Sequence, residues 1–135
     1  MKTKAIKITL VGFSAFLIIP ALAFSDEPLP APSMPNTIQE TGTYFEIIAS
    51  EYLNVSLQSS QEITVVLESV PKTISLILEA SLGASSTELT VMGLESNTTY
   101  YKYGDSYKNE ETILVNAKGS YTWIQNITKT HHIWL

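Results

Sequence analysis

From Tyr44 onward, apolar and polar residues alternate in short runs, and this period of two limits the fold more than any other feature of the sequence. Successive side chains of a β-strand point to opposite faces of a sheet, so each run predicts a strand with one buried face. The inward positions of the successive runs are Leu53, Val55 and Leu57; Ile63, Val65 and Leu67; Ile74, Leu76 and Leu78; Leu89 and Val91; Ile113 and Val115; and Tyr121, Trp123, Gln125 and Ile127. β-Branched and aromatic residues are frequent in these runs, as is typical of strands.

Turn-forming residues separate the runs at 70–72, 83–86, 95–97 and 116–119. Short strands at this spacing favour a sandwich or a small barrel, and we expect an all-β, immunoglobulin-like or fibronectin type III-like β-sandwich. In the turn at 116–119, Gly119 can supply the positive φ that a bulged hairpin between the flanking runs needs. The segment Ser75–Ser81 could also form a helix, but its short length and its isoleucines favour a strand.

The first residues have the order of a secretory signal peptide. Lys2, Lys4 and Lys7 precede an uncharged, mostly apolar run over 8–19, and Ala21-Leu22-Ala23 gives the small-x-small pattern that signal peptidase cleaves. The apolar run is shorter than the roughly 20 residues of a membrane-spanning helix. We therefore expect cleavage after Ala23 or Ser25, no membrane span after removal of the leader, and an extracellular or cell-surface location.

The composition divides the chain into three parts. After the signal peptide (1–25), residues 26–42 contain four closely spaced prolines, Pro28, Pro30, Pro32 and Pro35, which predict an extended linker. Residues 43–135 then form the predicted β-sandwich domain, which is large enough to bury one core. The apolar run over 131–135 either docks into the sheet or leads into a longer protein.

Charge and cysteine content narrow the classes of function. The leader holds three of the eight lysines and none of the 13 acidic residues, so the remaining chain has a net charge of −8 and no arginine. Such a chain is a poor partner for the phosphates of nucleic acids. The sequence contains no cysteine, which excludes disulfides, thiol nucleophiles and zinc-thiolate sites.

A short motif resembles fibronectin type III domains. The segment Leu94-Glu95-Ser96-Asn97-Thr98-Thr99-Tyr100 is similar to the family's L-x-P-x-T-x-Y stretch, with Ser96 in the position of the proline. The matching residues are Leu94, Thr98 and Tyr100. The resemblance implies a structural corner, in which the Tyr100 hydroxyl reaches back to the upstream backbone. The family keeps apolar residues inward on the following strand, whereas here that parity falls on Lys102 and Gly104.

A broader resemblance covers most of the chain after the leader. The strings YLNVSL (52–57), VLESVP (66–71), NTTYYKY (97–103) and GSYTW (119–123) are similar to an N-terminal module of exported bacterial proteins. In those proteins a leader precedes the module, and right-handed β-helix repeats often follow it. The resemblance implies no activity and supplies no functional residues.

Tyrosines are concentrated in one stretch of the chain. Parity along a strand places Tyr101 and Tyr103 on one face and Tyr100 on the other. Exposed tyrosines stack on sugar rings and anchor binding interfaces, which makes Tyr101, Tyr103 and Tyr107 candidate binding residues. The alternative is that these rings pack in the core.

The sequence shows neither the residue spacing of a known metal site nor that of a known catalytic motif. Asp105, Glu110 and Glu111 form an oxygen-rich stretch that matches no calcium loop, and the adjacent His131 and His132 would point to opposite faces of a strand. The sequence has no G-x-S-x-G, H-E-x-x-H, P-loop or G-x-G-x-x-G motif. We therefore expect no metal, no cofactor and no catalytic residues.

These observations predict a non-catalytic binding or spacer module of a larger cell-surface or secreted protein, with a protein or a glycan as its ligand. The alternative is a carbohydrate-binding accessory domain of a secreted polysaccharide-active enzyme. A third hypothesis is that the protein is a secreted enzyme whose active site follows no known motif. Fold class alone does not separate these functions, because β-sandwiches support many of them.

Overall fold

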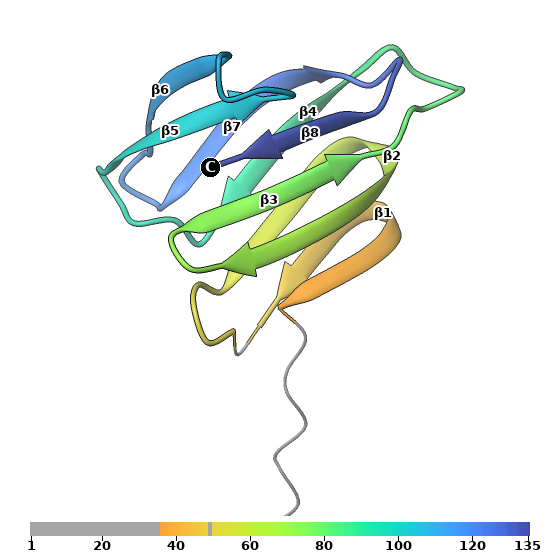
Figure 1. The fold of residues 1–135 in the computed structure, drawn as a ribbon. Coiled ribbons are helices and arrows are strands. Elements are labelled where there is room, and N and C mark those ends of the chain that lie inside the picture. The colour runs from red at the N-terminus through yellow and green to blue at the C-terminus, as the bar shows by residue number, and fades with distance from the viewer. Residues whose placement is uncertain (1–35, 49) are drawn as a thin grey trace, which may run out of the picture. The chain divides into compact units, whose positions relative to one another are not determined.

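The computed structural model describes residues 36–48 and 50–135, which form eight β-strands and no helix (Figure 1). The strands are β1 (Thr37–Ile47), β2 (Val55–Val70), β3 (Thr73–Leu78), β4 (Ser86–Met92), β5 (Thr99–Gly104), β6 (Glu110–Leu114), β7 (Ser120–Asn126) and β8 (His131–Trp134). Every pairing between them is antiparallel, so the predicted all-β class is confirmed. The described residues contain no helix that could cross a membrane.

The long strand β2 organises the sheet. β1 pairs with β2 along most of its length, whereas β4 pairs with the first half of β2 at Ser56–Ser59 and β3 with the second half at Val65–Val70. Two arms therefore leave β2: β4 continues to β7, and β3 continues through β8 and β5 to β6. The sheet curls into a nearly closed, barrel-like layer around the core (Figure 1).

The register of β1 against β2 shifts between the two halves of β2, where the sequence is polar. Ser59 and Thr87 are buried there, and their hydroxyls lie 2.6 Å apart. The Thr87 hydroxyl also accepts a hydrogen bond from the backbone N–H of Gln61 at 3.2 Å. Buried hydroxyls without partners would be costly, and here Ser59 and Thr87 satisfy each other and bind the Gln61 backbone, so they stabilise the irregular point of the sheet.

The alternation in the sequence accounts for the core. Val55, Leu57, Ile63, Val65 and Leu67 of β2 are all buried, and apart from Ser59 the residues between them are more exposed. The inward positions of the other strands complete the core, including Phe45, Ile47, Ile74, Leu76, Leu78, Leu89, Val91, Ile113, Trp123 and Ile133. The predicted inward positions Leu53, Tyr121 and Gln125 are only partly buried.

Two boundaries differ from the predictions. The first strand starts at Thr37, so residues 37–42, assigned to the linker, pair with β2. Their side chains are mostly exposed, so this part of the strand has no alternation of apolar and polar residues. The runs over 53–57 and 63–67 both contribute to the single strand β2. The ambiguous segment Ser75–Ser81 lies largely in β3 and contains no helix.

The turn at 116–119 is present, but the hairpin expected around it is not. Gly119 has a φ of 72°, and its N–H donates to the carbonyl of Asn116 at 3.0 Å. The strands on either side diverge, because β6 pairs with β5 and β7 pairs with β4. The predicted signal peptide, 1–25, and most of the proline-rich segment lie outside the described residues.

Candidate functional site

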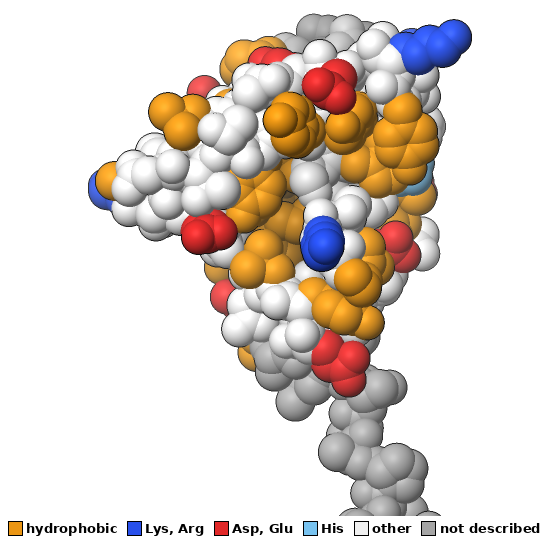
Figure 2. All heavy atoms as spheres, turned by 60° about the vertical axis from the view of Figure 1, so that its left-hand side comes forward, with side chains coloured by type: hydrophobic (Ala, Val, Ile, Leu, Met, Phe, Trp, Pro, Cys, Tyr) orange, Lys and Arg blue, Asp and Glu red, His pale blue; other side chains and the backbone are white. Residues whose placement is uncertain are grey.

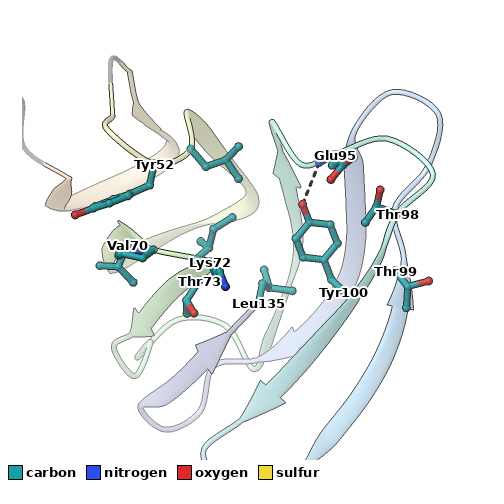
Figure 3. A pocket seen from close by; sticks show the side chains of 12 residues that line it. Tyr52, Val70, Lys72, Thr73, Glu95, Thr98, Thr99, Tyr100 and Leu135 are labelled. Atoms are coloured by element: carbon teal, nitrogen blue, oxygen red, sulfur yellow. Dashed lines mark hydrogen bonds between the residues drawn. The ribbon is translucent and has the colours of Figure 1, made fainter.

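Tyr100 lies near the start of β5, beside the turn that follows β4. Its hydroxyl accepts a hydrogen bond from the backbone N–H of Glu95 at 3.1 Å, which is the contact that a corner tyrosine makes (Figure 3). Leu94 is buried, and the Thr98 hydroxyl donates to the carbonyl of Ser96 at 3.3 Å. The Tyr100 ring itself is half-buried, because it also lines a groove at the surface.

The other tyrosines of the cluster lie toward the outside. Tyr101 is 53% exposed and Tyr107 is 73% exposed, while Tyr103 is half-buried. The Tyr103 hydroxyl donates to a carboxylate oxygen of Glu110 at 2.9 Å. This hydrogen bond, more than any other contact, raises the pKa of Tyr103 above its ordinary value. Tyr103 is therefore held in place by the edge strand β6.

Four rings from three segments form an aromatic stack, defined here as Tyr103, Tyr107, His132 and Trp134. Tyr107 lies nearly parallel to Trp134 at 5.1 Å between ring centroids and meets Tyr103 edge-on at 5.6 Å. The ring centroid of His132 lies 3.8 Å from that of Trp134, on the same strand. Sequence reasoning missed Trp134, although its alternation with Ile133 and Leu135 was a usable signal for an outward-facing ring.

Two adjoining hollows make up the groove. The larger, of about 570 Å³, lies between the β2–β3 turn and the start of β5, and it is lined by residues that include Tyr52, Leu53, Val70, Glu95 and Thr98. Figure 3 places Tyr52 and Val70 on one wall and Tyr100 on the other, with Leu135 between them. The smaller, of about 270 Å³, is lined by Tyr101, Tyr103, Tyr107 and Trp134.

The two hollows share Lys72, Thr73, Thr99, Tyr100 and Leu135, so they form one continuous groove. Hydrophobic side chains gather around a hollow on the face of the domain that Figure 2 shows. Lys72 and Glu95 are the charged side chains in the lining. The groove therefore offers apolar contact area and hydroxyl groups, and it carries little net charge.

Asp105 fixes the beginning of β8 against the end of β5. One oxygen accepts from the backbone N–H of His132 and the other contacts the His131 ring nitrogen Nδ1, both at 2.8 Å. Partial burial alone would raise the pKa of Asp105, but the hydrogen bonds from His132 and His131 outweigh it and lower the pKa below its ordinary value. The His132 ring contacts the Ser75 hydroxyl instead, so the two histidines have different partners.

The acidic residues near this loop do not converge. Asp105 contacts the histidine strand, Glu110 accepts from Tyr103, and Glu111 forms an ion pair with Lys102 at 2.6 Å. Within residues 36–48 and 50–135, no group of three acidic or histidine side chains could hold a metal ion.

The fold and the groove define a class: a small antiparallel β domain with an aromatic-lined surface groove. Comparison with family models, with curated proteins and with solved structures gives no significant match to the chain. The chemistry of the groove is therefore the basis for assigning a function.

Proposed function

We propose that this protein is a non-catalytic, exported binding module of a larger cell-surface or secreted protein, and that the groove is its binding site. The observation that carries the proposal is the lining of the groove. Exposed tyrosines and a tryptophan surround two connected hollows, and interface anchors are enriched in these residue types. Lys72 and Glu95 are the charged side chains in the lining, and Asp105 and Glu110, on neighbouring parts of the same strands, are engaged in structural contacts.

The export part of this proposal is tested by producing the full chain in a bacterium with a general secretion system. The order of charged, apolar and small residues in the leader predicts that the exported product begins at Phe24 or Asp26. N-terminal sequencing of protein from the periplasm and the medium measures this. An exported product that still begins at Met1 would contradict it.

The binding part is tested with the exported protein, labelled fluorescently, on intact cells of the organism that produces it. We expect saturable attachment that falls at least about tenfold in Thr99→Trp, which places a large ring in both hollows from an exposed position. The matched control is Thr130→Trp, because Thr130 is also exposed and lines neither hollow. Equal attachment by the wild type and Thr99→Trp would contradict the proposal.

A carbohydrate ligand is the second candidate, and the exposure of Tyr101 and Tyr107 favours it. Sugar rings stack on open aromatic faces. In the aromatic stack, however, Trp134 lies against both His132 and Tyr107, which leaves Tyr107 and Tyr101 as the more open rings. A glycan array probed with the wild type and with Tyr107→Ala tests this candidate: specific spots that disappear in the variant would support it, and an array without specific spots would oppose it.

We also propose that the domain is a variant of the fibronectin type III-like Greek-key sandwich. The hydrogen bond from Glu95 to the Tyr100 hydroxyl supports this kinship. The polar residue Lys102 at an inward position of β5 and the arms that diverge from β2 distinguish it from a regular sandwich of two sheets.

A further inference from the structure

Three of the described strands pair on one side only and so present a free edge. β1 pairs with β2, β6 with β5, and β7 with β4. Natural proteins protect such edges with charged side chains or bulges, because an unprotected edge pairs with another strand. β1 carries Glu40, Glu46 and a register shift after Gly42, and β6 carries Glu110 and Glu111. The edges of β1 and β6 are therefore protected.

The edge of β7 has no such protection. Its seven residues include no charged residue and no proline, and all of them pair with β4 without a register shift. On its outward face Ile124 is 67% exposed, and Thr122 is exposed beside it. The edge also lies apart from the groove, since β2 and β4 separate it from β3, the strand that Leu135 contacts. β7 is thus a regular, uncharged edge on an acidic domain.

The backbone groups at the centre of β7 point toward the free edge. Just after β7, the N–H of Ile127 donates to the carbonyl of Ser85 at 3.0 Å, on the side of β4. Hydrogen-bonding groups alternate along an antiparallel strand, so Trp123 also faces β4, while Thr122 and Ile124 face away from it.

Both ends of this edge are already occupied. The side-chain oxygen of Asn116 accepts from the N–H of Ser120, and the Asn116 N–H donates to the Ser120 carbonyl, both at 3.1 Å. At the other end, the side chain of Gln125 donates to the carbonyl of Asn126 at 3.0 Å. Within residues 36–48 and 50–135, the edge-facing donors and acceptors between these ends have no hydrogen-bond partner.

A second copy of β7 fits this edge. When two copies run antiparallel and are centred on Trp123, Thr122 of each chain lies opposite Ile124 of the other, and each such pair exchanges both backbone hydrogen bonds. β-Branched side chains pair favourably across strands, and no like charges face each other in this arrangement. β7 offers no charge that would select a charged partner, whereas its own copy matches it in pattern and length.

We propose that the domain forms a two-fold symmetric homodimer through β7, in which the sheets of two copies join into one. The contact is closed by its symmetry, so association stops at the dimer. Ile124 of each chain then lies diagonally across from Ile124 of the other, within reach of a long side chain. This inference goes beyond the proposed binding function and does not involve the groove.

The test is analytical ultracentrifugation of the exported protein. A contact between two strand edges is small, so we expect a reversible equilibrium of monomer and dimer between about 10 µM and about 1 mM.

Two variants disrupt the pairing in different ways. Ile124→Lys places a charge on the edge, and Thr122→Pro removes an N–H that pairs with the other copy. The matched controls lie on β6: Leu114 is 68% exposed for Leu114→Lys, and the Thr112 N–H also faces a free edge for Thr112→Pro. We expect the two β7 variants to raise the dissociation constant at least about tenfold and the controls to stay within about twofold of the wild type. Both lysine variants change the net charge equally, so charge repulsion between copies does not explain a difference between them.

Amide hydrogen exchange of the wild type, measured by NMR, reports the contact without any substitution. The amides of Thr122 and Ile124 should exchange at least about tenfold more slowly at the highest protein concentration than at the lowest, since exchange from the dimer requires opening. The amides of Thr112 and Leu114 on β6 should not depend on concentration.

Three results would overturn the proposal. The first is a protein that stays monomeric up to about 1 mM. The second is a dimer that both β7 variants leave intact, which would place the contact on another surface. The third is protection of Thr122 and Ile124 at every concentration, which would show that another segment of the same chain covers the edge.

Dimerisation and groove binding can be tested separately. Thr99→Trp, which fills the groove, should dimerise like the wild type because Thr99 lies on β5. A wild type that dimerises but does not attach to cells would contradict the binding function alone. A strictly monomeric protein that attaches through the groove would contradict the dimer alone.

Discussion

Tyr100 and Tyr101 are adjacent in the chain and have opposite environments. Tyr100 is half-buried and accepts a hydrogen bond from Glu95, while Tyr101 is 53% exposed. Loss of a fully buried aromatic ring costs about 3–5 kcal/mol. Because Tyr100 also borders the groove, its ring should contribute less to the stability of the fold than a fully buried ring does.

We predict that Tyr100→Ala lowers the free energy of unfolding by about 2 kcal/mol and Tyr100→Phe by about 0.5 kcal/mol, because water can replace the hydroxyl at the exposed Glu95 N–H. Tyr101→Ala is the matched control and should change stability by less than about 0.5 kcal/mol. Urea unfolding of the four proteins measures this order. A larger loss in Tyr101→Ala would mean that the outward face is the better packed one.

Asp105 carries a pH-dependent contribution to stability. Its pKa in the folded protein lies below the ordinary value of 3.8. The fold therefore favours the ionised carboxylate, and this contribution is complete above about pH 5 and disappears as the pH falls through the folded pKa. The side chain is 38% exposed, so solvent screening keeps the contribution below about 1 kcal/mol.

We predict that Asp105→Asn is less stable than the wild type at pH 7 and that the two converge between about pH 5 and pH 2. Asparagine suits the substitution because Asp105 has a φ of 59°, which asparagine tolerates. Thermal melts of both proteins at several pH values measure the difference. A difference that is the same at pH 7 and pH 2 would show that the charge of Asp105 is not its cause.

At the scale of elements, Gly119 decides how β6 leads into β7. Its φ of 72° is left-handed, and a Cβ there would lie 2.4 Å from the carbonyl oxygen of Leu94. We predict that Gly119→Ala costs at least about 2 kcal/mol, through backbone strain and displacement of that carbonyl. Gly83→Ala is the control, since nothing lies within 4 Å of its Cβ, and should stay within about 0.5 kcal/mol of the wild type.

Chemical denaturation of both glycine variants measures this difference. Equal stabilities would show that the turn can rearrange without affecting the strands that it joins.

Lys102 connects the arm of β5 and β6 with β7. Its ammonium lies 5.2 Å from the Trp123 ring centroid and 5.6 Å from that of Tyr121, and it pairs with Glu111. Only 14% of its side chain is exposed, so the aliphatic stem contributes apolar contacts at an inward position. The contributions of packing and of charge at Lys102 to stability can therefore be measured separately.

We predict that Lys102→Met stays within about 1 kcal/mol of the wild type, because it keeps the stem and leaves the half-exposed Glu111 in contact with solvent. Lys102→Ala should cost about 1–2 kcal/mol through the lost contacts with Trp123. Urea unfolding compares the two variants. A methionine variant as unstable as the alanine variant would show that charge, and not packing, holds the arm to β7.

For the whole molecule, the absence of cysteine and the dispersal of Asp105, Glu110 and Glu111 lead to one expectation. We predict the same melting temperature with EDTA, with calcium and with a reductant. A rise of more than about 5 °C with calcium, which corresponds to roughly 1 kcal/mol for a domain of this size, would contradict this prediction.

Much of the core could be predicted because alternation is a local property. The burial of Val55, Val65 and Leu76 follows from the period of two in their own segments. The exposure of Tyr101 and the inward position of Lys102 follow from the same parity. β1 escaped prediction over residues 37–42, because an exposed strand needs no apolar alternation.

The sequence by itself therefore determined the all-β class, most inward positions and the position of the turn at 116–119, since each depends on residues near one another in the chain. Only the tertiary structure decided the partners of the strands and the composition of the groove. The groove joins Lys72, Tyr100 and Trp134, and the turn at Gly119 separates β6 from β7 instead of pairing them. The apolar faces of the strands resemble one another, so the sequence of one strand does not specify its partner. Strand pairing is decided by packing between residues that are far apart in the chain.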